Sequence, residues 1–337
     1  MENCDIIVGL QYGDEGKGKV VYNLIQKKNY DYCVRFNGGP NAGHTIYHNG
    51  KKLITRQIPT GIFYGLTCII GSNCVLDLNK LEEEIKLVDS VGINDIRQKL
   101  KIANNCHIIN EEYIIEDKKT DKVGSTGSGI RPAYREKYNR RGIRADTFED
   151  ILGCEIIDSY QVLSKEGIKI LCEGAQGFML DIDYGKYPYV TSSNCHAGIV
   201  TNNGLSIRNI RNVYGICKCY NTYVGNMEYQ PVGEEGNIME ELGRLGHEFG
   251  SNTERKRQCN WLDIDELIKA IYINGVNVLI MNKCDIIEKL GIYKLYHKNK
   301  LIEFENFNKM KEYIINNIKS VIRFNIEFIF SFNKDTI

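Results

Sequence analysis

The chain has 337 residues, of which 43 are basic and 43 acidic, so its formal net charge at pH 7 is zero. This balance argues against a general binder of nucleic acids or membrane surfaces, and we expect neither partner. The length can bury a substantial core, and we predict a single domain that spans residues 1–337.

The twelve cysteines are predicted to be reduced thiols of the core rather than disulfides, because a chain of this size needs no covalent staples. There is no C-x-x-C pair, which disfavours a zinc site. Met1 is followed by neither a basic leader nor a long apolar run. The sequence therefore predicts an intracellular, cytoplasmic protein.

The first structural signal is a glycine-rich loop. Residues 5–10 are predicted to form a buried strand and residues 17–27 a helix, with a tight turn at Gly13, Gly16 and Gly18. Turn amides and a helix N-terminus then converge on one point, which favours phosphate binding. The spacing nearly matches a Walker P-loop, but Val20 stands where that motif has a hydroxyl ligand for magnesium. Asp14 is the candidate that replaces it, because a carboxylate among phosphates otherwise meets repulsion.

A second strand, residues 32–36, leads into the glycine-rich segment 37–45. Open α/β sheets bind ligands at such strand ends. His44 lies between Gly43 and Thr45 in this segment, and we expect it to have a chemical role. Further along, alternation in 51–77 predicts strands, and helical spacing in 79–91 predicts a surface helix.

Two more glycine-rich loops follow, at 124–134 and at 174–177 after a predicted strand at 168–173. The hydroxyls of the loop at 124–134 could hold a nucleotide monophosphate. The spacing of its residues is equally compatible with a mobile loop that carries solvated arginines. A short basic run at 252–258 favours an acidic substrate over a polyanion, with a solvated basic turn as the alternative.

Near the C-terminus, a strand at 276–281 ends in Asn282-Lys-Cys-Asp285, the form that GTP-binding proteins use to recognise guanine. There the aspartate accepts hydrogen bonds from two guanine donors that adenine lacks in that pattern. An amphipathic helix at 309–322 and a last strand at 326–330 complete the chain. Strands alternating with helices predict an α/β fold.

Seven motifs, taken in order, resemble the adenylosuccinate synthetase family. They lie at 13–19, 41–45, 124–127, 140–144, 173–177, 187–193 and 261–263. The resemblance implies a P-loop NTPase-like fold with a large, mostly parallel central sheet flanked by helices and carrying small insertions. It also implies a magnesium-dependent homodimer that joins IMP to L-aspartate while hydrolysing GTP, giving adenylosuccinate, GDP and phosphate.

The resemblance also implies catalytic roles. Asp14 would remove the N1 proton of IMP, so that the 6-oxygen attacks the γ-phosphate of GTP. His44 would act as the acid at the leaving bridging oxygen, and Lys17 would neutralise developing charge. Gln176 is the fourth catalytic residue implied. The aspartate amine would then displace phosphate at C6.

The remaining site residues are implied by the same alignment of motifs. Magnesium would be held by Asp14 and the Gly43 carbonyl. The GTP contacts are Gly13, Glu15, Gly16, Lys17, Gly18, Lys19, Gly43, His44, Thr45, Arg257, Lys283 and Asp285. The IMP contacts are Asp14, Lys17, Asn41, Ala42, Gly43, His44, Thr126, Arg140, Gln176, Thr191 and Arg255, with Arg140 offered across the dimer interface. The aspartate contacts are Ser251, Asn252, Thr253, Arg255 and Arg257.

Two alternatives stay open at this point. A phage branch of the family joins aspartate to dGMP, and this chain shares its short length and its Gly-Ser-Thr-Gly form at 124–127. Many members of that branch have serine where this chain keeps Asp14, which favours IMP. A GTP-binding switch protein without a product is the other alternative, but it gives His44 and Gln176 no role.

Overall fold

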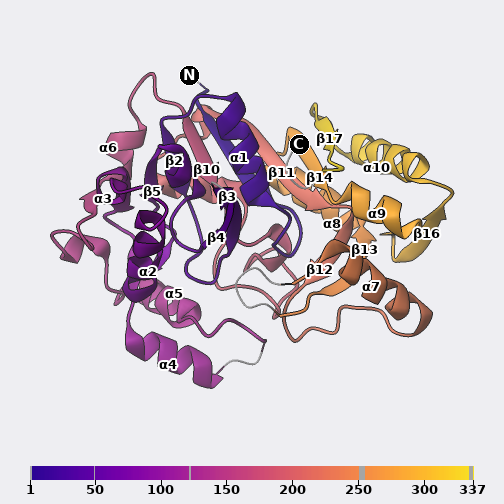
Figure 1. The fold of residues 1–337 in the computed structure, drawn as a ribbon, viewed down its shortest axis with the longest axis horizontal. Helices are drawn as coiled ribbons and strands as arrows, with labels where there is room; N and C mark the ends of the chain where they lie inside the picture. The colour runs from indigo at the N-terminus through magenta and orange to yellow at the C-terminus, as the bar shows by residue number, and fades with distance from the viewer. Residues whose placement is uncertain (1, 49, 121–122, 250–254, 334–336) are drawn as a thin grey trace.

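The central feature of the molecule is one large parallel sheet (Figure 1). The computed structural model describes residues 2–48, 50–120, 123–249, 255–333 and 337. Within them, nine strands pair in the order β17-β14-β11-β1-β10-β2-β5-β7-β9, and each neighbouring pair is parallel. The bounds are β1 (Cys4–Gly9), β2 (Tyr32–Arg35), β5 (Thr67–Ile70), β7 (Leu100–Ala103), β9 (Glu155–Ile157), β10 (Ile170–Glu173), β11 (Ile210–Lys218), β14 (Val278–Asn282) and β17 (Glu327–Phe330).

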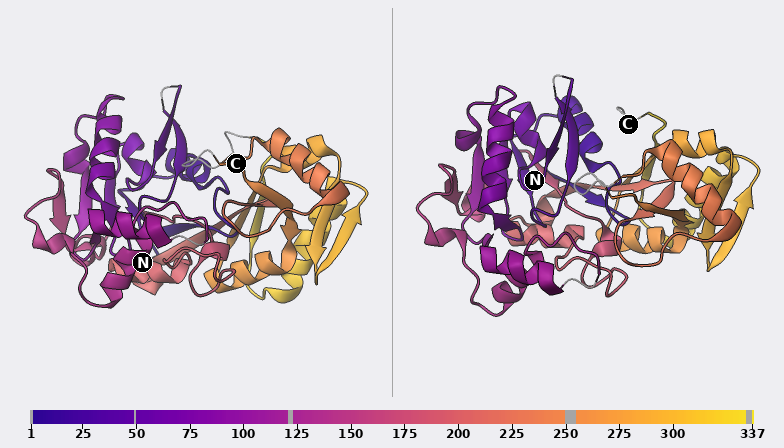
Figure 2. Two further views of the ribbon diagram at one scale, coloured as in Figure 1. Left: turned by 90° about the horizontal axis from the view of Figure 1, so that it is seen from below. Right: turned by 60° about the horizontal axis from the view of Figure 1, so that its bottom comes forward.

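The strand order divides the molecule into two halves about β1 and β10. Strands from the first half of the chain extend the sheet on one side, and β11, β14 and β17 extend it on the other, as the separation of indigo and yellow in Figure 2 shows. Smaller sheets are added at the periphery. They are the four-stranded sheet β12 (Tyr220–Tyr223), β13 (Gln258–Asp263), β15 (Tyr293–His297) and β16 (Lys300–Phe304), the hairpin β3 (His44–His48) and β4 (Lys51–Thr55), and the pair β6 (Val75–Asp77) and β8 (His107–Ile109).

Helices flank the central sheet (Figure 1). Their bounds are α1 (Lys17–Lys27), α2 (Leu78–Asp89), α3 (Ile96–Lys99), α4 (Glu111–Thr120), α5 (Ile130–Tyr138), α6 (Ser159–Leu163), α7 (Gly233–Gly246), α8 (Ile264–Asn274), α9 (Cys284–Leu290) and α10 (Phe307–Val321). Short 3₁₀ turns lie at Thr60–Tyr64, Ala145–Thr147, Phe178–Leu180, Ala197–Asn203 and Ile207–Asn209. The prediction of an α/β fold with a large parallel sheet, flanking helices and small insertions is confirmed.

The sheet forms from these residues because its central strands are apolar runs that can be buried on both faces. All six residues of β1 are buried, as are all four of β10. The predicted helix at 17–27 is confirmed residue for residue, and the helices predicted at 79–91 and 309–322 correspond to α2 and α10. Helices α7 and α8 were not predicted, although both are amphipathic.

One predicted loop is shorter than expected. The glycine-rich segment was expected to run to Tyr134, but α5 begins at Ile130. Gly129 precedes the helix with a φ of 78°, a left-handed conformation that glycine adopts without strain. Pro132 lies in the first turn, where a missing backbone donor costs nothing.

All twelve cysteines are buried and free, which confirms the prediction that they belong to the core. Within the part of the chain that the structure describes, no helix is long and apolar enough to cross a membrane.

Candidate active site

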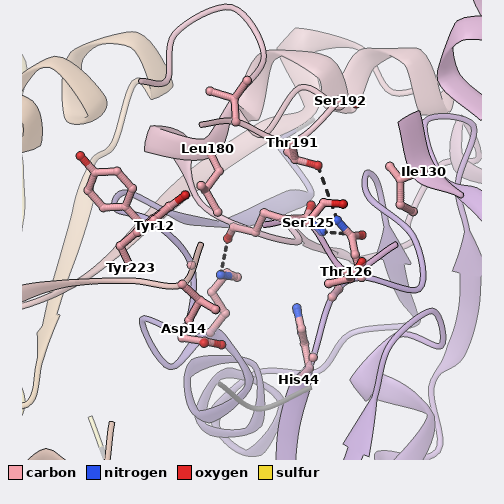
Figure 3. Close-up of a pocket in the computed structure, with 18 of the residues that line it drawn as sticks. Tyr12, Asp14, His44, Ser125, Thr126, Ile130, Leu180, Thr191, Ser192 and Tyr223 are labelled. Carbon is pink, nitrogen blue, oxygen red and sulfur yellow. Dashed lines mark hydrogen bonds between the residues drawn. The ribbon is translucent and has the colours of Figure 1, made fainter. Parts of the chain in front are cut away.

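A cavity of about 1270 Å³ lies where several loops meet. Because parallel strands end at one edge of a sheet, the loops after β1, β2 and β10 converge there. Figure 3 shows Asp14 and His44 along one side of the open space, with Tyr12 and Tyr223 at one flank and Thr126 and Thr191 at the other. Asp14, His44, Thr126 and Thr191 come from four separate segments, which the sequence analysis assigned to one site.

The loop after β1 has the compact form expected of a phosphate-binding turn. Gly13 and Gly16 have φ angles of 89° and 91°, and Asp14 itself has a φ of 57°. A non-glycine residue in this region is uncommon and often marks a functional position. Gly18 is needed for packing, because a Cβ there would lie 2.8 Å from the Thr45 carbonyl oxygen.

The side chain of Glu15 stabilises this loop from its buried side. Its fully buried carboxylate accepts hydrogen bonds from the amides of Gln11 (3.2 Å) and Gly13 (2.9 Å) and from Lys17 Nζ (2.7 Å). Lys17 Nζ also donates to the carbonyl oxygen of Gln176, at 2.5 Å. The side chain of Glu15 therefore stabilises the loop, so a contact from residue 15 to GTP would come from its backbone.

Asp14 is paired with an arginine that lies far away in the sequence. Arg257 donates from Nε to Asp14 Oδ2 at 2.9 Å, and its Nη2 lies 2.7 Å from the same oxygen. Arg257 also pairs with the buried carboxylate of Glu248. The two residues predicted to serve as base and as ligand contact are thus brought together across 243 positions of sequence.

His44 is held in a buried ionic cluster with Arg35 and Glu173. Its Nδ1 is hydrogen-bonded to Glu173 Oε1, and its Nε2 lies 2.8 Å from Arg35 Nη1. Burial and the Arg35 guanidinium lower the pKa of His44 to about 4, although Glu173 opposes the shift. The imidazole is therefore neutral at pH 7, and the contacts favour the tautomer that donates from Nδ1 and accepts at Nε2.

This cluster predicts a loss of stability in acid. Burial alone would raise the pKa of Glu173, but Arg35 and His44 lower it to about 2, below the ordinary 4.5. A carboxyl with a lowered folded-state pKa stabilises the fold above its unfolded pKa, and this contribution is lost as the pH falls through about 2. The free energy of unfolding should therefore fall between about pH 6.5 and pH 2, first because the unfolded chain protonates His44 more readily than the fold does, and below about pH 4.5 because of Glu173, as measured by urea denaturation at a series of pH values.

Glu173→Gln should lower the free energy of unfolding at pH 7 by roughly 3 kcal/mol, because it leaves Arg35 without its buried counter-charge. It should also flatten the fall below pH 4.5. Glu155→Gln, which changes an exposed carboxylate paired with Lys101, is the matched control and should alter neither quantity. An unchanged acid slope in the Glu173 variant would contradict the assignment.

A chain of amides links the loop after β10 to the opposite wall. Gln176 Nε2 donates to Asn41 Oδ1 at 2.9 Å, and Asn41 Nδ2 lies 3.5 Å from Thr191 Oγ1. Gln176 also has a positive φ of 56°. Among the described residues its buried Oε1 has no hydrogen-bond partner. Such an atom on a cavity wall is suited to accept a hydrogen bond from a ligand.

The guanine motif lies outside the cavity lining. Lys283 Nζ donates to the Gly246 carbonyl at 2.8 Å, and Asp285 pairs with Lys289 at 2.9 Å. Asn282 Nδ2 donates to the Glu15 carbonyl at 2.7 Å, so the first residue of the motif supports the phosphate loop. Lys283 and Asp285, the residues predicted to recognise guanine, therefore follow a residue that contacts the phosphate loop directly.

The structure brings most of the predicted site residues to one cavity. Those that line it are Gly13, Asp14, Gly16, Lys17, Gly18, Lys19, Asn41, Ala42, Gly43, His44, Thr45, Thr126, Gln176, Thr191 and Arg255. Those that do not are Glu15, Arg140, Arg257, Lys283 and Asp285. Ser251, Asn252 and Thr253 lie outside the described residues. Arg140 is exposed on the surface.

The sequence analysis missed the charged residues that support the site. Arg35, Glu173 and Lys218 each end a buried strand, and each is at most 1% exposed. A charged residue inside an apolar strand is the signal that identifies such positions, since burial of a charge requires a partner. Glu248 carried no comparable signal, because it lies in the turn after the amphipathic helix α7 and not inside an apolar strand.

The donor set suits a magnesium ion. The Asp14 carboxylate and the backbone of Gly43 come from two loops that line the same cavity. Magnesium prefers oxygen ligands and commonly takes only one or two from the protein. Within the described residues no group of three or more metal-ligating side chains occurs.

Comparison with known proteins shows the family of this chain. Residues 6–158 and 147–323 match the family model for adenylosuccinate synthetase. The adenylosuccinate synthetase of Parabacteroides distasonis is 41% identical over 341 positions, covering 86% of this chain and 79% of the relative. That of Chlorobium chlorochromatii is 38% identical and covers 86% and 78%.

Solved structures show the same fold. A fully ligated adenylosuccinate synthetase from Plasmodium falciparum superposes with a TM-score of 0.85 at 26% identity, covering 99% of this chain and 98% of that one. A succinoaminodeoxyadenylate synthetase from cyanophage S-2L, bound to dGMP and to dATP as an energy donor, gives 0.77 at 22% identity and covers 99% and 93%. The chain belongs to the adenylosuccinate synthetase family and is a carbon–nitrogen ligase.

Proposed function

We propose that the protein ligates L-aspartate to C6 of IMP through a 6-phosphoryl intermediate, with GTP as the phosphoryl donor. The observation that carries this proposal is the position of Asp14, a carboxylate within a phosphate-binding turn on the wall of a large cavity. A carboxylate there can accept a proton from one ligand while the surrounding amides bind the phosphates of another.

In the first step the N1 proton of IMP passes to Asp14, and the 6-oxygen attacks the γ-phosphorus of GTP. The bond to the β-γ bridging oxygen breaks and GDP leaves. In the second step the amine of aspartate attacks C6, the C6–O bond breaks and phosphate departs, giving adenylosuccinate, while the amine loses one proton to solvent and Asp14 releases the proton that it took from N1. Phosphorylation is needed because an oxygen on a purine ring is otherwise a poor leaving group.

His44 and Lys17 are the groups placed to assist the first step. Lys17 lines the cavity while its Nζ is held by the Glu15 carboxylate and the Gln176 carbonyl oxygen, and we propose that it also contacts the γ-phosphate of GTP. His44 is neutral in the empty site, and the negative charge of bound GTP would favour its protonated form and its action as an acid.

A magnesium ion held by Asp14 and the Gly43 carbonyl would supply electrostatic stabilisation of the charge on the transferring phosphoryl group. Binding of the ion requires Arg257 to give up its contact with Asp14 Oδ2, or to share it. We propose that the remaining contacts to IMP, GTP and aspartate are made by the residues that the family resemblance implies.

The family resemblance also underlies our proposals for the oligomeric state, the base pocket and the cellular location. We propose a homodimer in which exposed Arg140 reaches the partner's IMP site, and a base pocket for GTP at Lys283 and Asp285. The cavity lining extends from Tyr12 to Arg255, which supports treating residues 1–337 as one functional unit. Twelve free thiols suit a reducing compartment, and we propose a cytoplasmic location.

Comparison of the two acceptors tests the proposal. With GTP and aspartate held at saturation, we expect kcat/KM for IMP to exceed that for dGMP by at least about 10-fold, since each unmatched polar group in a site costs at least this factor. Product should be identified as adenylosuccinate by mass spectrometry. Faster turnover with dGMP would assign the chain to the other acceptor, and absence of any adduct would refute ligation.

A further inference from the structure

Four charged side chains form a row that leads from the interior to the cavity. Lys218 Nζ lies 3.3 Å from Glu248 Oε2, Glu248 pairs with Arg257 Nη1, and Arg257 Nη2 lies 2.7 Å from Asp14 Oδ2. Lys218 and Glu248 are each 1% exposed and Arg257 is 8% exposed. Positive and negative charges alternate along the row, so each buried charge has an opposite neighbour.

The interior end of the row is built by strand alternation. Lys218, Tyr220 and Thr222 are two residues apart, which places their side chains on one face of β11 and β12. Tyr220 donates to Glu248 Oε1 at 2.6 Å, and Lys218 Nζ donates to Thr222 Oγ1 at 2.5 Å. Glu248 is thus fixed by donors on the rigid sheet.

Glu248 contacts Arg257 through both main chain and side chain. The amide of Arg257 donates to the Glu248 carbonyl oxygen at 3.1 Å, and its guanidinium pairs with the Glu248 carboxylate. This leaves Nε and Nη2 of Arg257 directed at Asp14. The planar guanidinium has a fixed fork of donors, so fixing one edge determines where the other edge points.

Burial of a carboxylate is costly unless it is well paired, and an apolar pair could fill the same volume at less cost. Burial would raise the pKa of Glu248, but Lys218 and Arg257 lower it to about 2, so the carboxylate stays charged. The edge of Arg257 that Glu248 does not contact, Nε and Nη2, faces the loop that carries Asp14.

We propose that Glu248 is a positioning residue that orients the guanidinium of Arg257 toward the loop of Asp14, with Lys218 balancing the charge of the Glu248 carboxylate. The inference rests on the proposed function, in which Arg257 contacts GTP and aspartate. Loss of the Glu248 charge then weakens binding of those two ligands, while Asn41, Thr126 and Gln176 still bind IMP.

Glu248→Gln tests this, because the amide keeps the size of the side chain and removes its charge. We expect KM for GTP and for aspartate to rise by about 10-fold, the effect of one lost charge-assisted hydrogen bond, while KM for IMP changes less than about threefold. Unchanged KM values for GTP and aspartate in a folded variant would overturn the proposal.

Asp5→Asn is the matched control. Asp5 is also fully buried and pairs with Arg211 at 2.7 Å and Lys28 at 3.2 Å, but it lies at the opposite end of β1 from the cavity. It should lower the melting temperature and leave all three KM values within about twofold of the wild type, since it acts on stability alone. A rise in the GTP and aspartate KM values here too would mean that general destabilisation explains the Glu248 result and would overturn the proposal.

Two further variants make the outcome decisive. In an Arg257→Gln background, adding Glu248→Gln should change KM for GTP and for aspartate by less than about twofold, because Glu248 acts through the guanidinium that is already missing. If the effects of the two substitutions multiply, Glu248 does not act through Arg257.

Tyr220→Phe removes one donor to Glu248 and keeps every charge, so it should raise the same two KM values by about threefold. If Glu248→Gln does not fold, unchanged KM values in Tyr220→Phe overturn the proposal. Absence of ligation by the wild-type chain would instead refute the proposed function.

Discussion

The Asp14→Asn variant is expected to form adenylosuccinate at least about 1000-fold more slowly than the wild type, because loss of a general base removes a factor of this size. The amide has nearly the same shape but cannot accept the N1 proton of IMP. It also leaves Nε and Nη2 of Arg257 facing a neutral group instead of the Asp14 carboxylate. Steady-state assays with IMP, GTP and aspartate, followed by product detection, measure the effect.

The same variant should weaken binding of magnesium and GTP together, because a carboxylate ligand is lost. Calorimetric titration with GTP in the presence and absence of magnesium measures this without any turnover. Asp146→Asn is the control, since Asp146 is exposed and pairs only with Arg144 at 2.6 Å in the contacts described. Near-normal turnover by Asp14→Asn would show that Asp14 is not the base.

His44→Asn should lower kcat by about 100-fold and change KM for IMP by less than about threefold. The amide nitrogen can still donate to Glu173 in place of Nδ1, so the buried carboxylate keeps a partner. It cannot become a cation that protonates the departing bridging oxygen. The effect should therefore appear in the chemical step and not in binding of the acceptor.

His297→Asn is the matched control for this variant. His297 is hydrogen-bonded to Tyr313 at 2.6 Å and does not line the cavity, so its replacement should leave kcat unchanged. A His44 variant with wild-type kcat and a raised KM for IMP would show that His44 only binds substrate. Melting curves for both variants separate such effects from loss of fold.

The locations of the site loops could be predicted because the signals are local. Gly13, Gly16 and Gly129 mark tight turns through their positive φ angles, and the apolar runs of β1 and β10 mark strands buried on both faces. Convergence of the loops followed from the rule that parallel strands end at one edge of a sheet. No tertiary contact is needed for either inference.

The sequence analysis missed the start of α5 and the whole of α7 and α8, because these helices depend on tertiary packing rather than on a local signal. Near Ile130 glycines and hydroxyls are typical of a loop, and only packing of the buried side chains of Pro132 and Tyr134 makes the helix favourable there. Intrinsic propensity is a weak signal, and burial of one face of a helix decides such cases.

The sequence by itself determined which side chains the cavity would bring together: a carboxylate in a glycine-rich turn, a histidine after the next strand, and an amide and hydroxyls on further loops. Only the tertiary structure decided the partners of these groups, Arg257 for Asp14, with Glu248 pairing in turn with Arg257, and Arg35 and Glu173 for His44. Arg257 is 243 residues from Asp14, and Glu173 is 129 residues from His44. Local patterns specify turns and strands, but pairing of buried charges depends on which distant segments the sheet order brings together.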